Sequence, residues 1–433
     1  MSVPLMPNSV RMLCLADLHL GRSSPPLPEG LTATQFTSRA AWEAIVHYAV
    51  SPENKIDAVL LCGDAVDQDD LFFETFHVFE KGIRALIDAK IPLIAVTGNH
   101  DASVFRKLAQ TISSPFFHLL GKDGKWESLL LTLNCRNIRF DGWSFPENHV
   151  SYNPLQRYHN DLPSISSTAP VIGLLHCDCP GTALSRYAPV KVQDFDGLPP
   201  LAWALGHIHK PATLYQNPLV FYCGSPQGLD ASENGDHGAH LLEILPNHEI
   251  KKNFISFAKI RWENIQLSIS QTDIDNFEER LIREFSALHA SFENHSPFLQ
   301  AVGCRLTLIG SHSAYRQIPT LIEKMQNRVL FSINSVEYFI EHTQNYTQPS
   351  YDLKQLSELS DPAGLLAKQL LALENSLPDV QSILQMTRAR LSSAQEKYAY
   401  FSQFEVSDEQ IKAWLLQSGY QALDLLLSQK EKE

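Results

Sequence analysis

The first half of the chain alternates short apolar runs with polar turns. Five of these runs are rich in Val, Ile and Leu and have the length of buried strands: 10–16, 58–62, 91–96, 171–175 and 201–205. Amphipathic stretches with helical spacing, at 32–50 and 70–90, lie between the first three runs. This alternation predicts an α/β fold that begins with a parallel sheet.

After residue 116 the pattern changes to strand-like pieces with few helical segments. The pieces lie at 128–133, 137–143, 219–222 and 239–244. Strands that follow a βαβα beginning in this way indicate a second sheet. The sequence therefore predicts a two-sheet sandwich flanked by helices.

A second region begins at residue 259. Its residues up to 345 mix strand-like alternation, as at 265–269, 305–309 and 336–340, with helical spacing at 274–288 and a helix near 319–326, which predicts a small α+β domain. Residues 346–433 have helical signals: Asp361-Pro362 as cap and first helical residue, and a capping box at 407–410. Gly419 is expected to break the last helix. The predicted domains are 1–258, 259–345 and 346–433.

Each of the five apolar runs in the first half is followed directly by a polar motif. The motifs are Asp17-Leu18-His19, Gly63-Asp64, Gly98-Asn99-His100-Asp101, His176 and Gly206-His207-Ile208-His209. Ligands of open α/β sheets bind at the carboxyl ends of the strands, and Asp, Asn and His are ligands of transition metals. The pattern predicts a two-metal hydrolase site, because two ions held together can activate water and stabilise a leaving oxygen.

The strand period suggests how these side chains meet. Asp17 and His19 would point to the same side if the strand continued through them, and His207 and His209 would do likewise. Asp64 is the natural carboxylate to bridge the ions. Any one motif alone is weak evidence for a site, since Gly-Asp is a common turn and a single buried His is usually a packing residue. The occurrence of all five motifs together indicates a metal site.

Charge and cysteine content limit the classes of partner and compartment. The net charge of −13 argues against a broad basic face for nucleic acid. It does not exclude nucleic acid, because bound ions or a partner subunit can supply positive charge. The seven cysteines are odd in number and lie partly in strands, which favours reduced thiols. With no run as long as a membrane span and no secretory start, a soluble cytoplasmic protein is expected.

The five motifs have the order D-x-H, G-D, G-N-H-[DE], H and G-H-x-H, and in this the sequence resembles the calcineurin-like metallophosphoesterases. The stretches Tyr222-Cys223-Gly224-Ser225-Pro226-Gln227 and Gly238-Ala239-His240 further resemble the DNA double-strand-break repair exonucleases, the SbcD-type nuclease subunits. The resemblance is firm over 10–250. It implies an α/β metallophosphoesterase sandwich, then a small α+β capping domain and a C-terminal helical segment that binds a partner.

The resemblance also implies the roles of the site residues. One metal would be held by Asp17, His19, Asp64 and His209, and the other by Asp64, Asn99, His176 and His207. His100 would protonate the leaving oxygen or steady the phosphate, with Asp101 orienting its ring. Some break-repair nucleases have a catalytic histidine three residues after the bridging aspartate. This chain has Asp67 there, which leaves His100 as the best acid.

The function implied is that of a DNA exo/endonuclease subunit dependent on two divalent ions, Mn²⁺ above all. Its partners would be DNA, an SMC-like coiled-coil ATPase and a second copy of the chain in a homodimer. The stripe Ile411, Trp414 and Leu415 is either helix core or a docking face for the ATPase.

Two alternatives stay open. One is a metallophosphoesterase that acts on nucleotides or phosphoproteins, and the acidic charge favours it. The other is a scaffold whose metal site only holds the fold. The complete ligand set argues against the scaffold, and the extra domain and helical tail argue against the small substrate.

Overall fold

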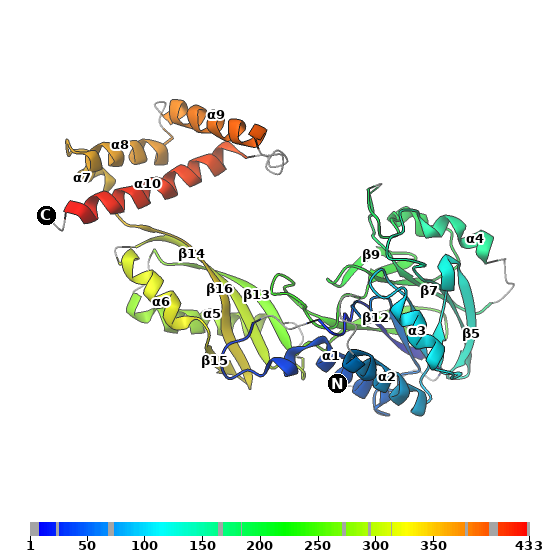
Figure 1. Cartoon of the computed structure of the whole chain (residues 1–433). Coiled ribbons are helices and arrows are strands. Elements are labelled where there is room, and N and C mark those ends of the chain that lie inside the picture. Colours follow the sequence, from blue (N-terminus) through cyan, green and yellow to red (C-terminus); the bar gives the residue numbers. More distant parts are fainter. Residues whose placement is uncertain are drawn as a thin grey trace. The chain divides into compact units, whose positions relative to one another are not determined.

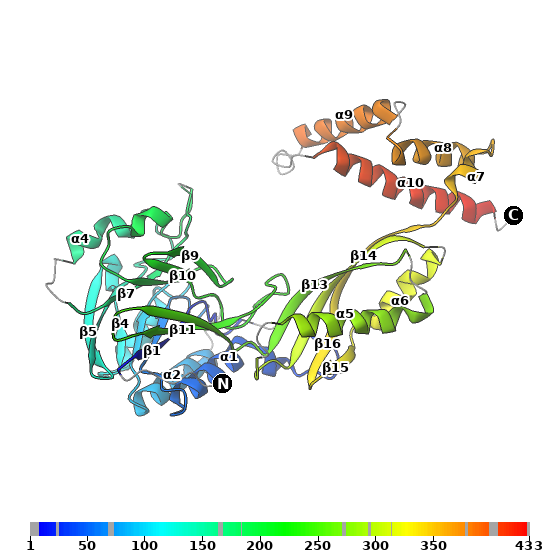
Figure 2. The ribbon, with the colours of Figure 1, turned by 180° about the vertical axis from the view of Figure 1, so that it is seen from behind.

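The chain is described here from a computed structural model that covers residues 8–22, 26–67, 73–162, 168–182, 184–270, 274–292, 296–312, 314–376, 380–397 and 406–430 (Figures 1 and 2). The chain forms two compact units. The first comprises Met1–Glu263, Ala287–Cys304 and Asn327–Glu341, and the second comprises Asn264–Ser286, Arg305–Gln326 and His342–Glu433. The division into domains at 258 and 345 stays a prediction.

The first sheet of the sandwich has the strand order β12-β11-β1-β2-β3-β4. Strands β1 to β4 are parallel neighbours, and β11 and β12 add an antiparallel edge beside β1. Their bounds are β1 Val10–Leu15, β2 Ala58–Cys62, β3 Leu93–Val96, β4 Phe117–Leu119, β11 Gly238–Ile244 and β12 Ile250–Ser256. The carboxyl ends of β1, β2 and β3 therefore lie at one edge.

The second sheet has the order β5-β6-β7-β8-β10-β9 and is also mixed. Strands β6, β7, β8 and β10 are parallel, while β5 and β9 form antiparallel edges. The bounds are β5 Glu127–Leu133, β6 Arg136–Trp143, β7 Val171–His176, β8 Ala202–Gly206, β9 Ala212–Gln216 and β10 Leu219–Tyr222.

Alternation along the buried strands divides the core into layers. In β1, Met12 and Cys14 face the space between the sheets, while Leu13 and Leu15 face the helices. Those helices are α1 Ser38–Val50, α2 Phe73–Asp88 and α3 Val104–Thr111. A third apolar cluster, around Trp143 and Trp203, covers the outer face of the second sheet beside α4 Tyr158–Asp161. The predicted two-sheet sandwich flanked by helices is confirmed.

The remaining sheet has the order β13-β14-β16-β15. Its strands are β13 Ile260–Ser268, β14 Ala301–His312, β15 Val329–Ile333 and β16 Val336–Pro349, and the helices of this region are α5 Phe277–Ser291 and α6 Ile318–Met325. This mixture matches the α+β character predicted for the region.

The C-terminal helices are α7 Leu353–Ser357, α8 Pro362–Glu374, α9 Gln381–Lys397 and α10 Asp408–Lys430. The Asp361 cap forms, with its carboxylate accepting from the Gly364 N–H at 2.8 Å. The predicted break at Gly419 is wrong, because α10 continues through it. A Cβ at Gly419 would meet Leu370 at 2.5 Å, so this glycine permits close packing of α10 on α8.

The stripe at Ile411, Trp414 and Leu415 is divided between core and surface. Ile411 is buried, Leu415 is half-buried against the core of these helices, and Trp414 is 48% exposed. Of these three side chains, only that of Trp414 is largely exposed. Across the described ranges, no helix has both the length and the apolar character needed to span a bilayer.

Candidate metal centre

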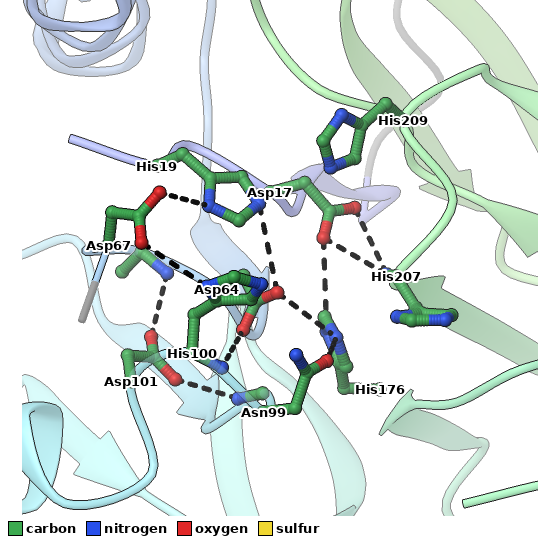
Figure 3. A network of polar contacts seen from close by, with 12 residues as sticks. Asp17, His19, Asp64, Asp67, Asn99, His100, Asp101, His176, His207 and His209 are labelled. Carbon is green, nitrogen blue, oxygen red and sulfur yellow. Dashed lines mark hydrogen bonds and ion pairs between the residues drawn. The ribbon is translucent and has the colours of Figure 1, made fainter. Parts of the chain in front are cut away.

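Every predicted site residue lies at the carboxyl end of a strand in one of the two sheets (Figure 3). Asp17 and His19 follow β1, Asp64 follows β2, and His207 and His209 follow β8, while the other predicted residues come from the ends of β3 and β7. The two sheets meet here, since the His176 Nδ1 atom lies 3.0 Å from the Cys62 carbonyl oxygen.

Tight turns, rather than strand alternation, aim the paired side chains. Strand β1 ends at Leu15 and β8 ends at Gly206, so the strand period does not reach either pair. Asp17, His19 and Asp64 have φ values of +53°, +42° and +52°, in the left-handed region that L residues rarely adopt, and His207 has +102°. The loop after β1 is held by its neighbour, with the Asp17 N–H donating to the Gly63 carbonyl at 3.0 Å.

Asp64 and His176 form the buried centre of the cluster. The His176 Nε2 atom lies 3.4 Å from Asp64 Oδ2 and 3.1 Å from Asn99 Oδ1. The Nδ1 atom of His176 faces the Cys62 carbonyl and lies 3.9 Å from Asp17 Oδ1. A proton on Nδ1 satisfies that carbonyl and leaves the Nε2 lone pair for a metal.

Asp17, His19 and His209 form a second group, whose ligand atoms all lie within 4.8 Å of one another. His19 is 2% exposed, yet neither ring nitrogen has a hydrogen-bond partner among the described residues. Its Nε2 atom lies 3.7 Å from Asp64 Oδ2, which is too far for a hydrogen bond. Buried polar atoms normally have a partner, so a buried imidazole without hydrogen bonds fits the role of a metal ligand.

His207 is placed differently from the other predicted ligands. Its ring centroid lies 5.4 Å from that of His176, but its ring does not belong to the close groups of metal-ligating atoms found among the described residues. Its backbone N–H donates to the Asp17 carboxylate at 3.0 Å. His207 therefore also holds Asp17 in place, independently of any ligand role.

His100 and Asp101 require a correction. Asp101 does not orient the His100 ring: its carboxylate accepts from the backbone N–H groups of Ala65 and Gly98 at 2.7 and 2.8 Å. The carboxylate at His100 Nδ1 is that of Asp67, at 3.2 Å. Asp101 comes directly after His100 but faces inward, because the loop uses it to tie the turns after β2 and β3 together.

Neighbouring buried groups in the cluster shift one another's pKa values. Burial alone would raise the pKa of Asp64, but His176, His19 and His100 together outweigh burial and hold that pKa well below its usual range. Burial alone would lower the pKa of His176, and Asp64 instead raises it to about 9. Burial and the neighbouring His176 lower the pKa of His207 to about 3, so the ring of His207 stays neutral and able to ligate.

Sequence reasoning missed Glu233, which contacts a predicted ligand. Its Oε1 atom lies 2.7 Å from His209 Nδ1. Burial would raise the pKa of Glu233, but the hydrogen bond and charge of His209, together with the Leu229 N–H and His237, outweigh burial and lower this pKa. Glu233 lies 24 residues after His209 in a loop between β10 and β11, outside every motif, so no spacing signal pointed to it.

At two motif glycines there is no room for a side chain. A Cβ at Gly98 would lie 2.2 Å from Asp64 Oδ1, and a Cβ at Gly206 would lie 2.0 Å from the Cys62 carbonyl oxygen. Real Cβ atoms essentially never come this close. The glycines therefore let the loops approach one another until the ligand atoms converge.

The donor set fits divalent metal ions. It combines wholly buried carboxylates with imidazoles and one amide oxygen, a mixture that suits Mn, Fe and Zn better than Ca. His19 Nε2, which has no hydrogen bond, could ligate such an ion, while Nδ1 lies 3.6 Å from Asp67 Oδ2. The residues whose ligand atoms could hold ions are Asp17, His19, Asp64, Asn99, His176 and His209, and the His100 ring also lies in a close group with His19 and Asp64.

Comparison with known proteins is consistent with this centre. Residues 10–211 match the family described as calcineurin-like phosphoesterase. An uncharacterized metallophosphoesterase of Bacillus subtilis, YhaO, is 26% identical over 265 residues, which is 59% of this chain and 62% of that protein. At 265 residues this match is longer than the 202 residues matched by the family.

Two further matches are shorter. The DNA double-strand break repair protein Mre11 of Aeropyrum pernix is 33% identical over 96 residues, 22% of each chain. A probable cyclic nucleotide phosphodiesterase of Psychrobacter arcticus is 28% identical over 97 residues, 22% of this chain and 33% of that protein. All three matches span less than two thirds of the relative's own length.

The family match ends at residue 211, after the last histidine of the fifth motif. The five motifs, the sandwich that carries them and the buried carboxylate and imidazole cluster all lie in that stretch, apart from the last two strands of the first sheet and the last two of the second. The family match thus covers 202 of the 433 residues, a little under half of the chain, and this stretch is similar to the calcineurin-like phosphoesterases.

Proposed function

We propose that this chain is a DNA exo/endonuclease that hydrolyses phosphodiester bonds with two divalent ions, Mn²⁺ above all. The observation that carries this proposal is the convergence of two buried carboxylates and three imidazoles, Asp17, Asp64, His19, His176 and His209, at one edge of the sandwich. Similarity to an archaeal Mre11 over 96 residues supports DNA as the substrate.

Bound ions supply the chemistry of water activation and of charge neutralisation on a phosphate. The chain's own residues supply the position of the ligands and a proton. The His100 side chain is 42% exposed, and its Nδ1 atom is engaged by Asp67. Its Nε2 atom thus faces away from Asp67 and is the natural donor of a proton to the leaving oxygen.

Asp101 acts as a positioning residue in this proposal. By accepting from the N–H groups of Ala65 and Gly98, it joins the two loops that carry Asp64 and Asn99. Burial and the nearby Asp64 raise the pKa of Asp101 to about 7. Two backbone donors to a buried carboxylate nevertheless make a strong fixed contact between these loops.

The C-terminal helices are proposed as the docking site for an SMC-like coiled-coil ATPase. Leu365, Trp414 and Leu425 on α8 and α10 are 63%, 48% and 65% exposed, and a docked partner would bury such side chains. We extend the proposal to a homodimer and to three parts: a nuclease domain at 1–258, a capping domain at 259–345 and the partner-binding helices at 346–433.

A smaller substrate is the second candidate. Similarity to a probable cyclic nucleotide phosphodiesterase over 97 residues and the net charge of −13 favour a nucleotide over a DNA backbone. The same centre would serve either substrate, because a cyclic nucleotide contains a phosphodiester as DNA does.

The deciding experiment compares substrates at fixed metal. Purified protein is assayed on plasmid, linear and hairpin DNA, on cyclic nucleotides and on a phosphomonoester, each with Mn²⁺, Mg²⁺ or no added metal. Asp64→Ala serves as the control for contaminating nucleases. Mn²⁺-dependent DNA cleavage that is absent from Asp64→Ala supports the nuclease, whereas rapid turnover of cyclic nucleotides without DNA cleavage supports the alternative.

A further inference from the structure

The loop between β10 and β11 reaches back to the metal centre through Glu233. Its Oε1 atom contacts His209 Nδ1 at 2.7 Å, and its Oε2 atom accepts from the Leu229 N–H at 2.8 Å. The side chains of His209 and Glu233 are only 24% and 20% exposed. Both carboxylate oxygens are thus used, and neither Glu233 nor the His209 ring can turn without losing a contact.

The loop is also tied to the backbone of His209. The Ser225 N–H donates to the His209 carbonyl at 2.8 Å, and the Ser225 hydroxyl lies 2.8 Å from His237 Nδ1. His237 Nε2 lies 3.1 Å from the Glu233 carbonyl. His237 Nδ1 also lies 3.1 Å from the Ser225 carbonyl oxygen, so His237 bridges Ser225 and Glu233 and the contacts form a closed ring through His209.

This ring decides which nitrogen of His209 is available. A carboxylate at Nδ1 accepts the ring proton and leaves the Nε2 lone pair free. His209 belongs to the close group with Asp17 and His19, on the side of the centre away from Asn99. A defect at Glu233 should therefore weaken one metal position more than the other.

We propose that Glu233 is a positioning residue that orients His209 and sets the affinity of the metal position formed by Asp17, His19 and His209. The inference deepens the proposed function and rests on it for the presence of two ions. Carboxylates behind metal-bound histidines contribute about 10- to 100-fold to metal affinity or activity, which sets the effect to expect here.

The experiment is calorimetric titration of the metal-free full chain with Mn²⁺, without substrate. Glu233→Ala should weaken one of two binding events about 10- to 100-fold and leave the other unchanged. Glu233→Gln retains an acceptor for His209 Nδ1 and should recover part of the lost affinity. Asp236→Asn, on the same loop but paired with Arg261, is the matched control and should bind like the unmodified chain.

A double-mutant cycle separates positioning from loop support. If Glu233 acts through His209, Glu233→Ala should have no further effect on Mn²⁺ affinity in a His209→Ala background. Equal losses with and without His209, or equal weakening of both binding events, would overturn the proposal. Two intact Mn²⁺ sites without phosphodiester hydrolysis would refute the proposed function alone, while a chain that binds no Mn²⁺ would refute both.

Discussion

Asp64 and His100 lie on neighbouring loops but differ in exposure. The Asp64 side chain is 3% exposed and contacts two buried histidines, whereas that of His100 is 42% exposed and held at one nitrogen. A buried carboxylate among imidazoles is suited to bind metal, and a half-exposed imidazole is suited to exchange protons with a substrate. In the proposed function, Asp64 therefore binds metal and His100 transfers the proton.

This separation predicts different outcomes for the two substitutions. Asp64→Ala should lose bound metal and with it all hydrolysis, whereas His100→Ala should keep its metal and lose about 10²- to 10⁴-fold in turnover. Metal analysis alongside phosphodiester kinetics measures both quantities. Full activity of His100→Ala on a substrate with a poor leaving group would contradict the role of proton donor.

A second prediction concerns Gly206. Gly206→Ala would place a methyl group 2.0 Å from the Cys62 carbonyl and 2.6 Å from His176 Nδ1, so we expect a loss of about 1–3 kcal/mol of stability together with weaker metal binding. Denaturant unfolding and Mn²⁺ titration test this. Gly197→Ala is the control, because no atom lies within 4 Å of its Cβ and any cost there should leave metal binding unchanged.

At the scale of elements, the apolar runs predicted the strands well because their patterns are local. The five runs before the motifs correspond to β1, β2, β3, β7 and β8, each ending within one or two residues of its motif. The convergence of the side chains, in contrast, does not follow from local sequence patterns. The turns at Asp17 and His207 depend on hydrogen bonds to distant loops, such as that between the His207 N–H and Asp17, which no periodicity shows.

Two misjudged positions have the same cause. Asp101 follows His100 in sequence, yet the carboxylate beside the His100 ring comes from Asp67, 33 residues earlier. Gly419 looks like a helix breaker, yet close packing against Leu370 offsets the cost of about 1 kcal/mol for glycine in a helix. In each case a tertiary contact overrides a sound local expectation.

A third prediction belongs to helix α8, which begins at the Asp361 cap. Asp361→Ala removes the acceptor for the Gly364 N–H and should destabilise the C-terminal helices by about 1 kcal/mol. Asp361→Ser can still cap the helix and should restore most of this stability. Chemical denaturation followed by far-UV circular dichroism measures the change, because Trp414 is one of six tryptophans and fluorescence would not report on this region alone. An Asp361→Ala chain as stable as the unmodified one would show that the cap is dispensable.

At the scale of the molecule, the C-terminal helices have a hydrophobic core of their own. Its members include Leu353, Leu370, Tyr420 and Leu423, and all of them lie beyond residue 350. Helix α7 belongs to this core, so a truncation at Asp361 would divide it. Removal of residues 351–433 takes the cluster away whole.

The fourth prediction follows from this separation. A chain ending at residue 350 should bind Mn²⁺ and cleave phosphodiesters as the full chain does, but should no longer co-purify with a coiled-coil ATPase. Metal titration, hydrolysis and co-expression with the ATPase test the three parts separately. Unfolding of the shortened chain would show that the helices support the rest of the fold, and retention of the ATPase would refute docking on them.

The left-handed turns at the centre have a further consequence for how this protein can change. At Asp17, His19 and Asp64 the backbone adopts a conformation that costs an L residue about 1–3 kcal/mol and that glycine adopts freely. Stability and function thus pull these positions in opposite directions. Under selection for heat resistance alone, we expect these three positions to drift towards glycine or asparagine. The chain would then become more thermostable as it lost its metal ligands.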